Sequence, residues 1–368
     1  MHPRRQHSLR GPAEPGPRRY PTTLTGWVRC AALLCGVVLL FVGCAPNTPQ
    51  DPLNPAGPFA RQPDQLWNLT FWIAVVIFFV VEGAIVFALV KFRHRPGRKA
   101  AQFHGNTRLE VVLTAVPALI LAGLAVPTVR TVFTLGSNPS GTMPLTVVAH
   151  QFWWEFSYPD HGIKTANEMH IPTDTTVRLR LEGAAADPVT GGAEVIHSFW
   201  VPRLAGTQDI VPGHVNYLLM EADSPGVYLG QCKEYCGLSH ANMRIRVIAH
   251  TQDDFEQWVA DQQAPAATSE LAAEGAALFA GEAGDLSQPC AACHSVESSL
   301  DAQPAIGPNL THFASRDTFA GATFENNEAN LRAWLADPSA IKPGATMPDL
   351  GLTRDQIDAL VEYLQTLE

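Results

Sequence analysis

The stretch GQCKEYCGLSHANM, residues 230–243, gathers several soft metal donors into one short segment. Cys232 and Cys236 are four residues apart, His240 follows four residues later, and Met243 comes three residues after that. The whole chain of 368 residues has only seven cysteines and six methionines. Such a cluster indicates a disulfide, a single metal ion, or a site that needs two thiolates at once.

The types of residue in this cluster favour one of these alternatives. Thiolate, thioether and imidazole together select copper among first-row metals. His197, just after an apolar run in EVIHSFWVPRLAG (194–206), supplies a second imidazole. A zinc site has no use for methionine, and a mononuclear blue-copper site needs only one of the two cysteines. We therefore favour a dinuclear copper centre with bridging thiolates, with Met243 and a backbone carbonyl as weak ligands.

The sequence around this cluster, from about 141 to 253, is typical of β-structure. The segment TVRLRLEG (176–183) alternates apolar and charged residues, as a half-buried strand does. Other β-branched or aromatic runs are separated by Pro, Gly and Asp turns. Several short strands in about 110 residues predict an antiparallel β-sandwich.

The N-terminus is typical of an export signal. Several arginines precede the apolar segment AALLCGVVLLFVGC (31–44), which is short for a membrane span. This predicts a signal peptide over 1–43, followed by an extracytoplasmic segment over 44–65. The Gly43-Cys44 pair resembles a bacterial lipoprotein cleavage site, although Phe41 departs from that pattern, so Cys44 is a candidate for lipidation.

Two further segments predict a transmembrane hairpin over 66–135. Residues 66–90 and 111–133 are each long and apolar enough to span a bilayer. The loop between them, KFRHRPGRKA (91–100), is rich in Lys and Arg, which places it in the cytoplasm. Everything after about Gly136 is then extracytoplasmic. Glu82 lies deep in the first span and is either functional or paired with a neighbouring subunit, whereas Glu110 lies at the cytoplasmic boundary of the second.

The C-terminal part, 268–368, carries a second motif after a polar linker at 254–267. CAACH, Cys290 to His294, is the attachment motif for haem c, in which Cys290 and Cys293 form thioethers and His294 binds iron. Spaced apolar residues on both sides predict helices. GATMPDL (344–350) offers Met347 as the sixth iron ligand, with His312 as an alternative.

Charge is distributed unevenly along the chain. From Ala267 to the C-terminus there are fifteen Asp and Glu and four Lys and Arg, whereas the rest of the chain has twenty acidic and twenty-one basic residues. Nucleic-acid binding needs basic residues at phosphates, so this composition argues against a nucleic-acid partner. An acidic C-terminal domain suits a partner with a basic face.

The order of motifs from about 102 to 250 resembles that of cytochrome c oxidase subunit II. The matching stretches are HGNTRLE, QFWWEFSYP, ANEMHIP, VIHSFWVPRLAG, DIVPG and GQCKEYCGLSHANM. The resemblance implies a cupredoxin-like domain with a CuA centre of two copper ions. The ligands that it implies are His197, Cys232, Cys236, His240, Met243 and the main-chain carbonyl of Glu234.

The resemblance also implies roles for residues outside the copper ligands. The side chain of Glu234 would contact a magnesium ion shared with the catalytic subunit. Trp153 and Trp154 match the aromatic stretch through which electrons enter the copper site, although both also suit core packing. Glu110 matches the carboxylate at the mouth of a proton pathway. Residues 268–368 resemble a small all-α class I cytochrome c.

The assembled parts predict subunit II of a terminal respiratory oxidase in the bacterial plasma membrane. Electrons from cytochrome c or a bc complex would pass through haem c and CuA to subunit I, whose haem and CuB reduce oxygen to water with proton translocation. A quinol oxidase subunit lacks the copper ligands, and nitrous oxide reductase needs a large additional domain. A copper-containing nitric oxide reductase subunit, or a copper-free sandwich fused to a cytochrome, remain alternatives.

Overall fold

The structure is a computed structural model of a chain that divides into two compact units, Met1–Thr48 and Pro49–Glu368. It describes residues 24–41, 48–97, 104–186, 192–266, 272–303 and 306–368. In the first unit the described element is one apolar helix, α1 (Leu24–Phe41), in the segment expected to be a signal peptide. Cys44 lies outside the described residues.

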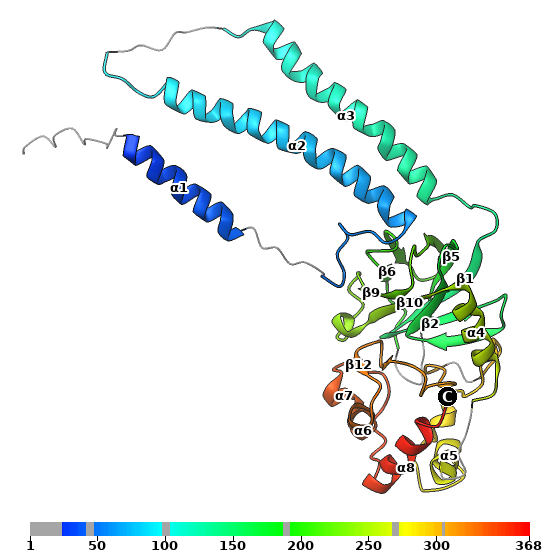
Figure 1. Ribbon diagram of the computed structural model, residues 1–368. Coiled ribbons are helices and arrows are strands. Elements are labelled where there is room, and N and C mark those ends of the chain that lie inside the picture. Colours follow the sequence, from blue (N-terminus) through cyan, green and yellow to red (C-terminus); the bar gives the residue numbers. More distant parts are fainter. Residues whose placement is uncertain (1–23, 42–47, 98–103, 187–191, 267–271, 304–305) are drawn as a thin grey trace, which may run out of the picture. The chain divides into compact units, whose positions relative to one another are not determined.

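The second unit begins with a hairpin of two long helices, α2 (Pro58–Lys91) and α3 (Thr107–Leu135) (Figure 1). At a rise of 1.5 Å per residue, their 34 and 29 residues exceed the roughly 30 Å hydrocarbon core of a bilayer. Apolar side chains cover both helices, and their most apolar windows are not buried by protein. Both helices therefore have the length and surface of membrane spans.

Helix α2 begins before the apolar segment expected from the sequence. Its first turns contain Arg61, which pairs with Asp223 of the following domain, and Ala60, which is buried. Pro58 suits the first turn because that position needs no N–H donor. The first turns of α2 thus lie outside the apolar segment and contact the domain that follows the hairpin.

Two five-stranded sheets form the next domain, with strand orders β3-β2-β1-β5-β8 and β4-β10-β9-β6-β7. Their strands are β1 (Met143–His150), β2 (Trp153–Tyr158), β3 (Ile163–Ala166), β4 (Glu168–Pro172), β5 (Val177–Gly183), β6 (His197–Trp200), β7 (Thr207–Ile210), β8 (Asn216–Met220), β9 (Gly226–Cys232) and β10 (Arg244–His250). Pairs β1–β5 and β4–β10 are parallel, unlike the expected all-antiparallel arrangement, because the intervening chain crosses between the sheets. One core, including Trp154, Phe156 and Phe199, fills the space between them.

Helix α4 (Gln252–Gln263) follows β10 and packs on the sandwich through Phe255 and Trp258. It occupies much of the segment that the sequence suggested as a linker. Its N-cap is Thr251, whose hydroxyl accepts a hydrogen bond from the Asp254 amide at 3.2 Å. The connection is therefore ordered as a helix before the next domain begins.

The C-terminal domain (272–368) is built from short helices around its own core. These are α5 (Ala273–Ala280), η3 (Cys290–Ala292), α6 (Glu328–Ala336), α7 (Pro338–Ile341) and α8 (Arg354–Leu364), with a small ribbon of β11 (Thr318–Phe319) and β12 (Phe324–Glu325). Helices α5 and α8 meet at Gly275, where a Cβ atom would lie 2.1 Å from the Ala359 carbonyl oxygen. The predicted combination of helical hairpin, β-sandwich and all-α domain is confirmed.

Candidate functional site

Strand pairing brings the cluster of soft donors together at one end of the sandwich. His197 is the first residue of β6 and Cys232 the last of β9, and these two strands are neighbours. The chain then turns through η1 (His240–Asn242) and re-enters the same sheet at β10. The Cys232 amide donates to the Met243 carbonyl at 2.9 Å, which closes the loop. Residues 35 positions apart in sequence therefore lie side by side.

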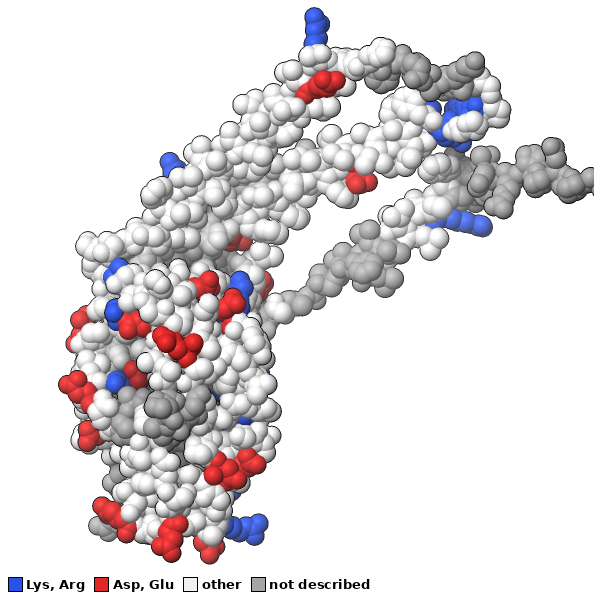
Figure 2. Space-filling view, turned by 180° about the vertical axis from the view of Figure 1, so that it is seen from behind, with Lys and Arg blue, Asp and Glu red and all other residues white. Residues whose placement is uncertain are grey.

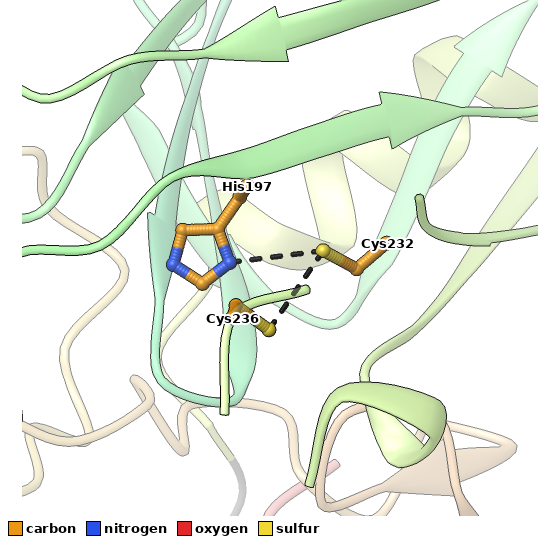
Figure 3. Close-up of side chains that lie close together, drawn as sticks. All are labelled: His197, Cys232 and Cys236. Carbon is orange, nitrogen blue, oxygen red and sulfur yellow. Dashed lines mark hydrogen bonds between the residues drawn. The ribbon is translucent and has the colours of Figure 1, made fainter. Parts of the chain in front are cut away.

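The donor atoms of this cluster are close enough to share metal ions. Cys232 Sγ lies 3.8 Å from His197 Nδ1 and 3.9 Å from Cys236 Sγ (Figure 3). Cys236 Sγ lies 3.6 Å from His240 Nδ1 and 3.9 Å from Met243 Sδ. Each cysteine is thus paired with one histidine, as a site with two metal ions and two bridging thiolates requires.

The two cysteines are separate thiols and not a disulfide. Their sulfur atoms are 3.9 Å apart, whereas a disulfide bond is about 2.05 Å long. The hydrogen bond between them lowers the pKa of Cys232 and, with burial, raises that of Cys236. The pairing therefore favours the thiolate form of Cys232, and thiolate is the form that binds metal.

The surroundings of the cluster fit a dinuclear copper centre. His197, Cys232, Cys236 and Met243 are all at least 97% buried, and the Glu234 carbonyl oxygen lies 3.2 Å from Cys232 Sγ. Together with the half-buried His240, they make a set of two thiols, two imidazoles, a thioether and a carbonyl, which matches the softness of copper. The Glu234 side chain itself is exposed.

The two tryptophans of the aromatic stretch have different surroundings. Trp154 is fully buried and lies edge-on to His197, with ring centroids 6.1 Å apart. Trp153 stacks on His150 at 3.9 Å and lines a cavity in the C-terminal domain. Trp154 therefore packs against His197, a predicted copper ligand, whereas Trp153 packs against His150.

Two residues that the sequence analysis did not single out also contact the ligand loop. Gln151 Nε2 donates to the Cys236 carbonyl at 2.5 Å. The Phe152 ring packs against Gly237, where a Cβ atom would lie 2.9 Å from Phe152 Cζ and φ is +132°. Both residues directly precede Trp153, but nothing in their spacing from the ligand loop indicated these contacts.

The C-terminal domain contains an apolar cavity that fits a haem. Its lining includes Cys290, Cys293, His294 and Met347, together with apolar side chains such as Phe279, Leu331, Leu335 and Leu360. His294 Nδ1 donates to the Pro308 carbonyl at 2.8 Å, which leaves Nε2 for a metal. Burial lowers the pKa of His294, so the neutral ligand form is favoured.

Met347 and His312, the two candidates for the sixth iron ligand, are placed differently. Met347 lines the cavity and its Sδ accepts a hydrogen bond from Trp334 Nε1 at 3.1 Å. His312 is not among the residues lining the cavity, and its Nε2 lies 3.0 Å from the Ala264 carbonyl oxygen. The geometry favours Met347.

The remaining candidate residues lie in the hairpin. Glu110 is in the first turn of α3, where its Oε1 lies 3.4 Å from the Asn106 amide. Glu82 lies on the exposed surface of α2. Both are therefore at positions open to a partner chain or to lipid.

Family models match three successive parts of the chain. The model for the cytochrome c oxidase subunit II transmembrane domain matches 52–131, that for its periplasmic domain matches 143–250, and that for cytochrome c matches 272–368. Cytochrome c oxidase subunit 2 of Alkalihalophilus pseudofirmus is 34% identical over 348 residues, which covers 90% of this chain and 95% of the relative. The chain belongs to the cytochrome c oxidase subunit II family.

A second relative agrees with this assignment. Cytochrome c oxidase subunit 2 of Bacillus sp. PS3 is 35% identical over 370 residues, covering 94% of this chain and 98% of the relative. The crystal structure of the periplasmic domain of subunit II of cytochrome oxidase from Bradyrhizobium japonicum is 27% identical, with a TM-score of 0.31, and covers 34% of this chain and 95% of that one. The chain is thus a membrane-anchored oxidase subunit II fused to a cytochrome c domain.

Proposed function

We propose that this subunit carries electrons from a cytochrome c or a bc complex, through its own haem c and a dinuclear CuA centre, to subunit I. There oxygen is reduced to water with proton translocation. Both redox domains lie on the extracytoplasmic side of the bacterial plasma membrane. The observation that supports this proposal is one chain with a sulfur and imidazole cluster and a cavity lined by Cys290, Cys293, His294 and Met347.

In this proposal each group has defined ligands on this chain. The proposed copper ligands are His197, Cys232, Cys236, His240, Met243 and the Glu234 carbonyl. Cys290 and Cys293 attach the haem, and His294 and Met347 bind its iron. These groups supply reversible one-electron chemistry, while the protein keeps their ligands buried and in fixed positions.

Residues outside the ligand sets have proposed roles toward subunit I. The exposed Glu234 side chain would bind magnesium at that interface. Glu110, in the cytoplasmic first turn of α3, would stand at the entry of a proton pathway. Trp153 and Trp154 would carry electrons toward the copper site, and Cys44 would carry a lipid anchor.

The electron donor should have a basic face. The cytochrome domain has an excess of acidic residues, and Figure 2 shows acidic side chains over the visible face of the folded domains with few basic ones between them. Complementary charge speeds the encounter of two redox proteins. A small basic cytochrome would fit this surface.

Metal analysis combined with rapid reduction tests the proposal. The purified chain should contain two copper ions and one covalent haem. Under anaerobic mixing with a reduced cytochrome, the haem absorption should change first and the copper absorption second. A chain that binds haem without copper, or copper that is reduced before haem, would contradict the proposal.

The purified complex distinguishes an oxidase from a nitric oxide reductase. The oxidase proposal predicts rapid oxygen consumption with reduced cytochrome as donor. Nitric oxide consumption without oxygen consumption would instead identify the other enzyme, because the difference lies in the partner chain.

A further inference from the structure

The cytochrome domain (272–368) inserts a buried lysine into the sandwich domain (143–250). Lys342 follows α7, and only 3% of its surface is exposed. Its Nζ donates to the Phe152 carbonyl at 2.9 Å and to the Ala320 carbonyl at 2.7 Å. Burial lowers the pKa of Lys342 to about 7, so the amine depends on these two acceptors for its polar contacts.

The sandwich domain makes the reciprocal contact with a buried glutamate. Glu168, in β4, is 2% exposed, and its carboxylate accepts hydrogen bonds from the amides of Thr318 at 2.9 Å and Asp317 at 3.2 Å. The Thr318 hydroxyl donates to the same carboxylate at 2.6 Å. Each domain thus holds the other's backbone through one buried ionisable side chain.

Two glycines of the cytochrome domain allow the close approach that these contacts need. A Cβ atom at Gly321 would lie 2.7 Å from the Phe152 carbonyl oxygen and 2.8 Å from Lys342 Nζ. One at Gly344 would lie 2.7 Å from Leu238 Cβ, in the loop that carries the proposed copper ligands. Both glycines also have positive φ, so a side chain there would strain the backbone as well.

The segment held by Lys342 contacts both proposed redox sites. Gln151 donates to the Cys236 carbonyl and accepts at its own carbonyl from Thr346 Oγ1, at 3.2 Å, next to Met347. Phe152 packs on Gly237 and also lines the haem cavity, together with Lys342. The segment 151–153 is therefore the part of the sandwich that lies between the copper loop and the haem cavity.

We propose that Lys342 is a positioning residue that, together with Glu168, clamps the cytochrome domain onto segment 151–153 and sets the geometry for electron transfer from haem to copper. The electron-transfer part of this inference rests on the proposed function. It differs from a freely tethered donor, because the haem cavity is held at one place against the copper loop. Removing either clamp should loosen the contact between the domains while each keeps its own core.

The test uses the full chain with Lys342→Met and Glu168→Ala, each of which removes one clamp. Arg354→Met is the matched control, since it removes a positive charge from an exposed position of the same domain. Asp160→Ala serves in the same way for Glu168. Absorption spectra first establish that each variant retains its haem and copper sites.

Two measurements then test the contacts made by Lys342 and Glu168. Amide hydrogen exchange over 151–154 and 317–323 should accelerate about tenfold or more in both clamp variants, because each loses hydrogen bonds to a buried ionisable group. After rapid reduction of the haem, electron transfer to copper should slow by about tenfold or more, while reduction of the haem by its donor is unchanged. Neither control should differ from the unmodified chain.

Unchanged exchange in both clamp variants would overturn the clamp, and faster exchange with unchanged electron transfer would overturn its positioning role. A different result would contradict the proposed function. If the haem of the unmodified chain never reduces copper, the function is wrong, whereas hydrogen exchange still decides the clamp.

Discussion

Cys236 lies next to the other cysteine of the ligand cluster and next to one of its histidines. Its sulfur lies 3.9 Å from Cys232 Sγ and 3.6 Å from His240 Nδ1. Cys236→Ser replaces a soft thiolate with a hard hydroxyl, which copper binds poorly. We expect copper to fall from two ions to at most about one per chain, with loss of the mixed-valence signal in electron paramagnetic resonance.

Gln231→Ser is the control for this variant, because Gln231 is exposed and directly precedes Cys232 in β9. It should keep both copper ions. Full copper content and an unchanged mixed-valence signal in Cys236→Ser would exclude a bridging role for this sulfur.

Met347 offers the cytochrome domain a soft ligand in a loop that lines the haem cavity. Met347→Leu preserves the volume and removes the sulfur, so the haem should stay covalently attached through Cys290 and Cys293. Loss of His/Met ligation should lower the midpoint potential of the haem. Redox titration measures this shift, and mass spectrometry checks that the haem is still bound; an unchanged potential would point to another ligand.

At this scale the sequence predicted the local motifs best. Cys232 and Cys236 are four residues apart in the sequence, and so are Cys290 and His294. Such short spacing is enough to predict that their side chains lie close together. Gln151 could not be found in this way, because its contact with Cys236 spans 85 residues. Such contacts depend on how the strands pack.

At the scale of elements, periodicity predicted strands and helices, but not which strands pair or where the helices pack. The alternation in β5 is visible in the sequence, yet its parallel pairing with β1 depends on how the chain crosses between sheets. The helix α4 was hidden because its polar sequence and the proline that follows resemble a linker. Its stability comes from contacts of Phe255 and Trp258 with the sandwich.

Those contacts include a pair of histidines beneath α4. His170 Nδ1 lies 2.8 Å from His250 Nε2, and the His170 ring stacks on Trp258 with centroids 4.4 Å apart. Burial, together with His250, Arg316 and Arg246, lowers the pKa of His170 well below its usual value. Burial likewise lowers the pKa of His250, against an opposing effect of Asp254.

This pair predicts acid sensitivity of the fold. Below about pH 6.5 the unfolded chain binds more protons at these histidines than the folded chain does, so the free energy of unfolding should fall as pH falls. The slope should be up to about 1.4 kcal/mol per pH unit for each histidine. Denaturant unfolding of the detergent-solubilised chain between pH 7 and 5 measures it.

His170→Phe keeps a ring against Trp258 and should reduce this slope. His214→Phe, which replaces an exposed histidine, is the control and should retain the full slope. Equal slopes in the two variants would mean that another group causes the acid sensitivity.

At the scale of the whole molecule, motif order predicted the series of domains, but not how the last two domains meet. The sequence suggested a tether, which would raise the effective concentration of the donor. The structure adds buried contacts from Lys342 and Glu168 that join residues 190 and 150 positions apart. A lone lysine in an acidic domain gives no sign in the sequence that it is buried.

The acidic charge of the cytochrome domain leads to the last prediction. The rate at which a basic donor reduces the haem should fall as salt rises, because the screening length shortens from about 10 Å at 0.1 M to about 3 Å at 1 M. Asp349→Lys reverses an exposed charge two residues from Met347 and should slow reduction several-fold at low salt, with little effect at high salt. Glu256→Lys makes the same change of charge on α4, away from the haem cavity, and should have a smaller effect. Stopped-flow reduction across a salt series measures both variants, and a flat profile for the unmodified chain would show that charge does not guide the donor.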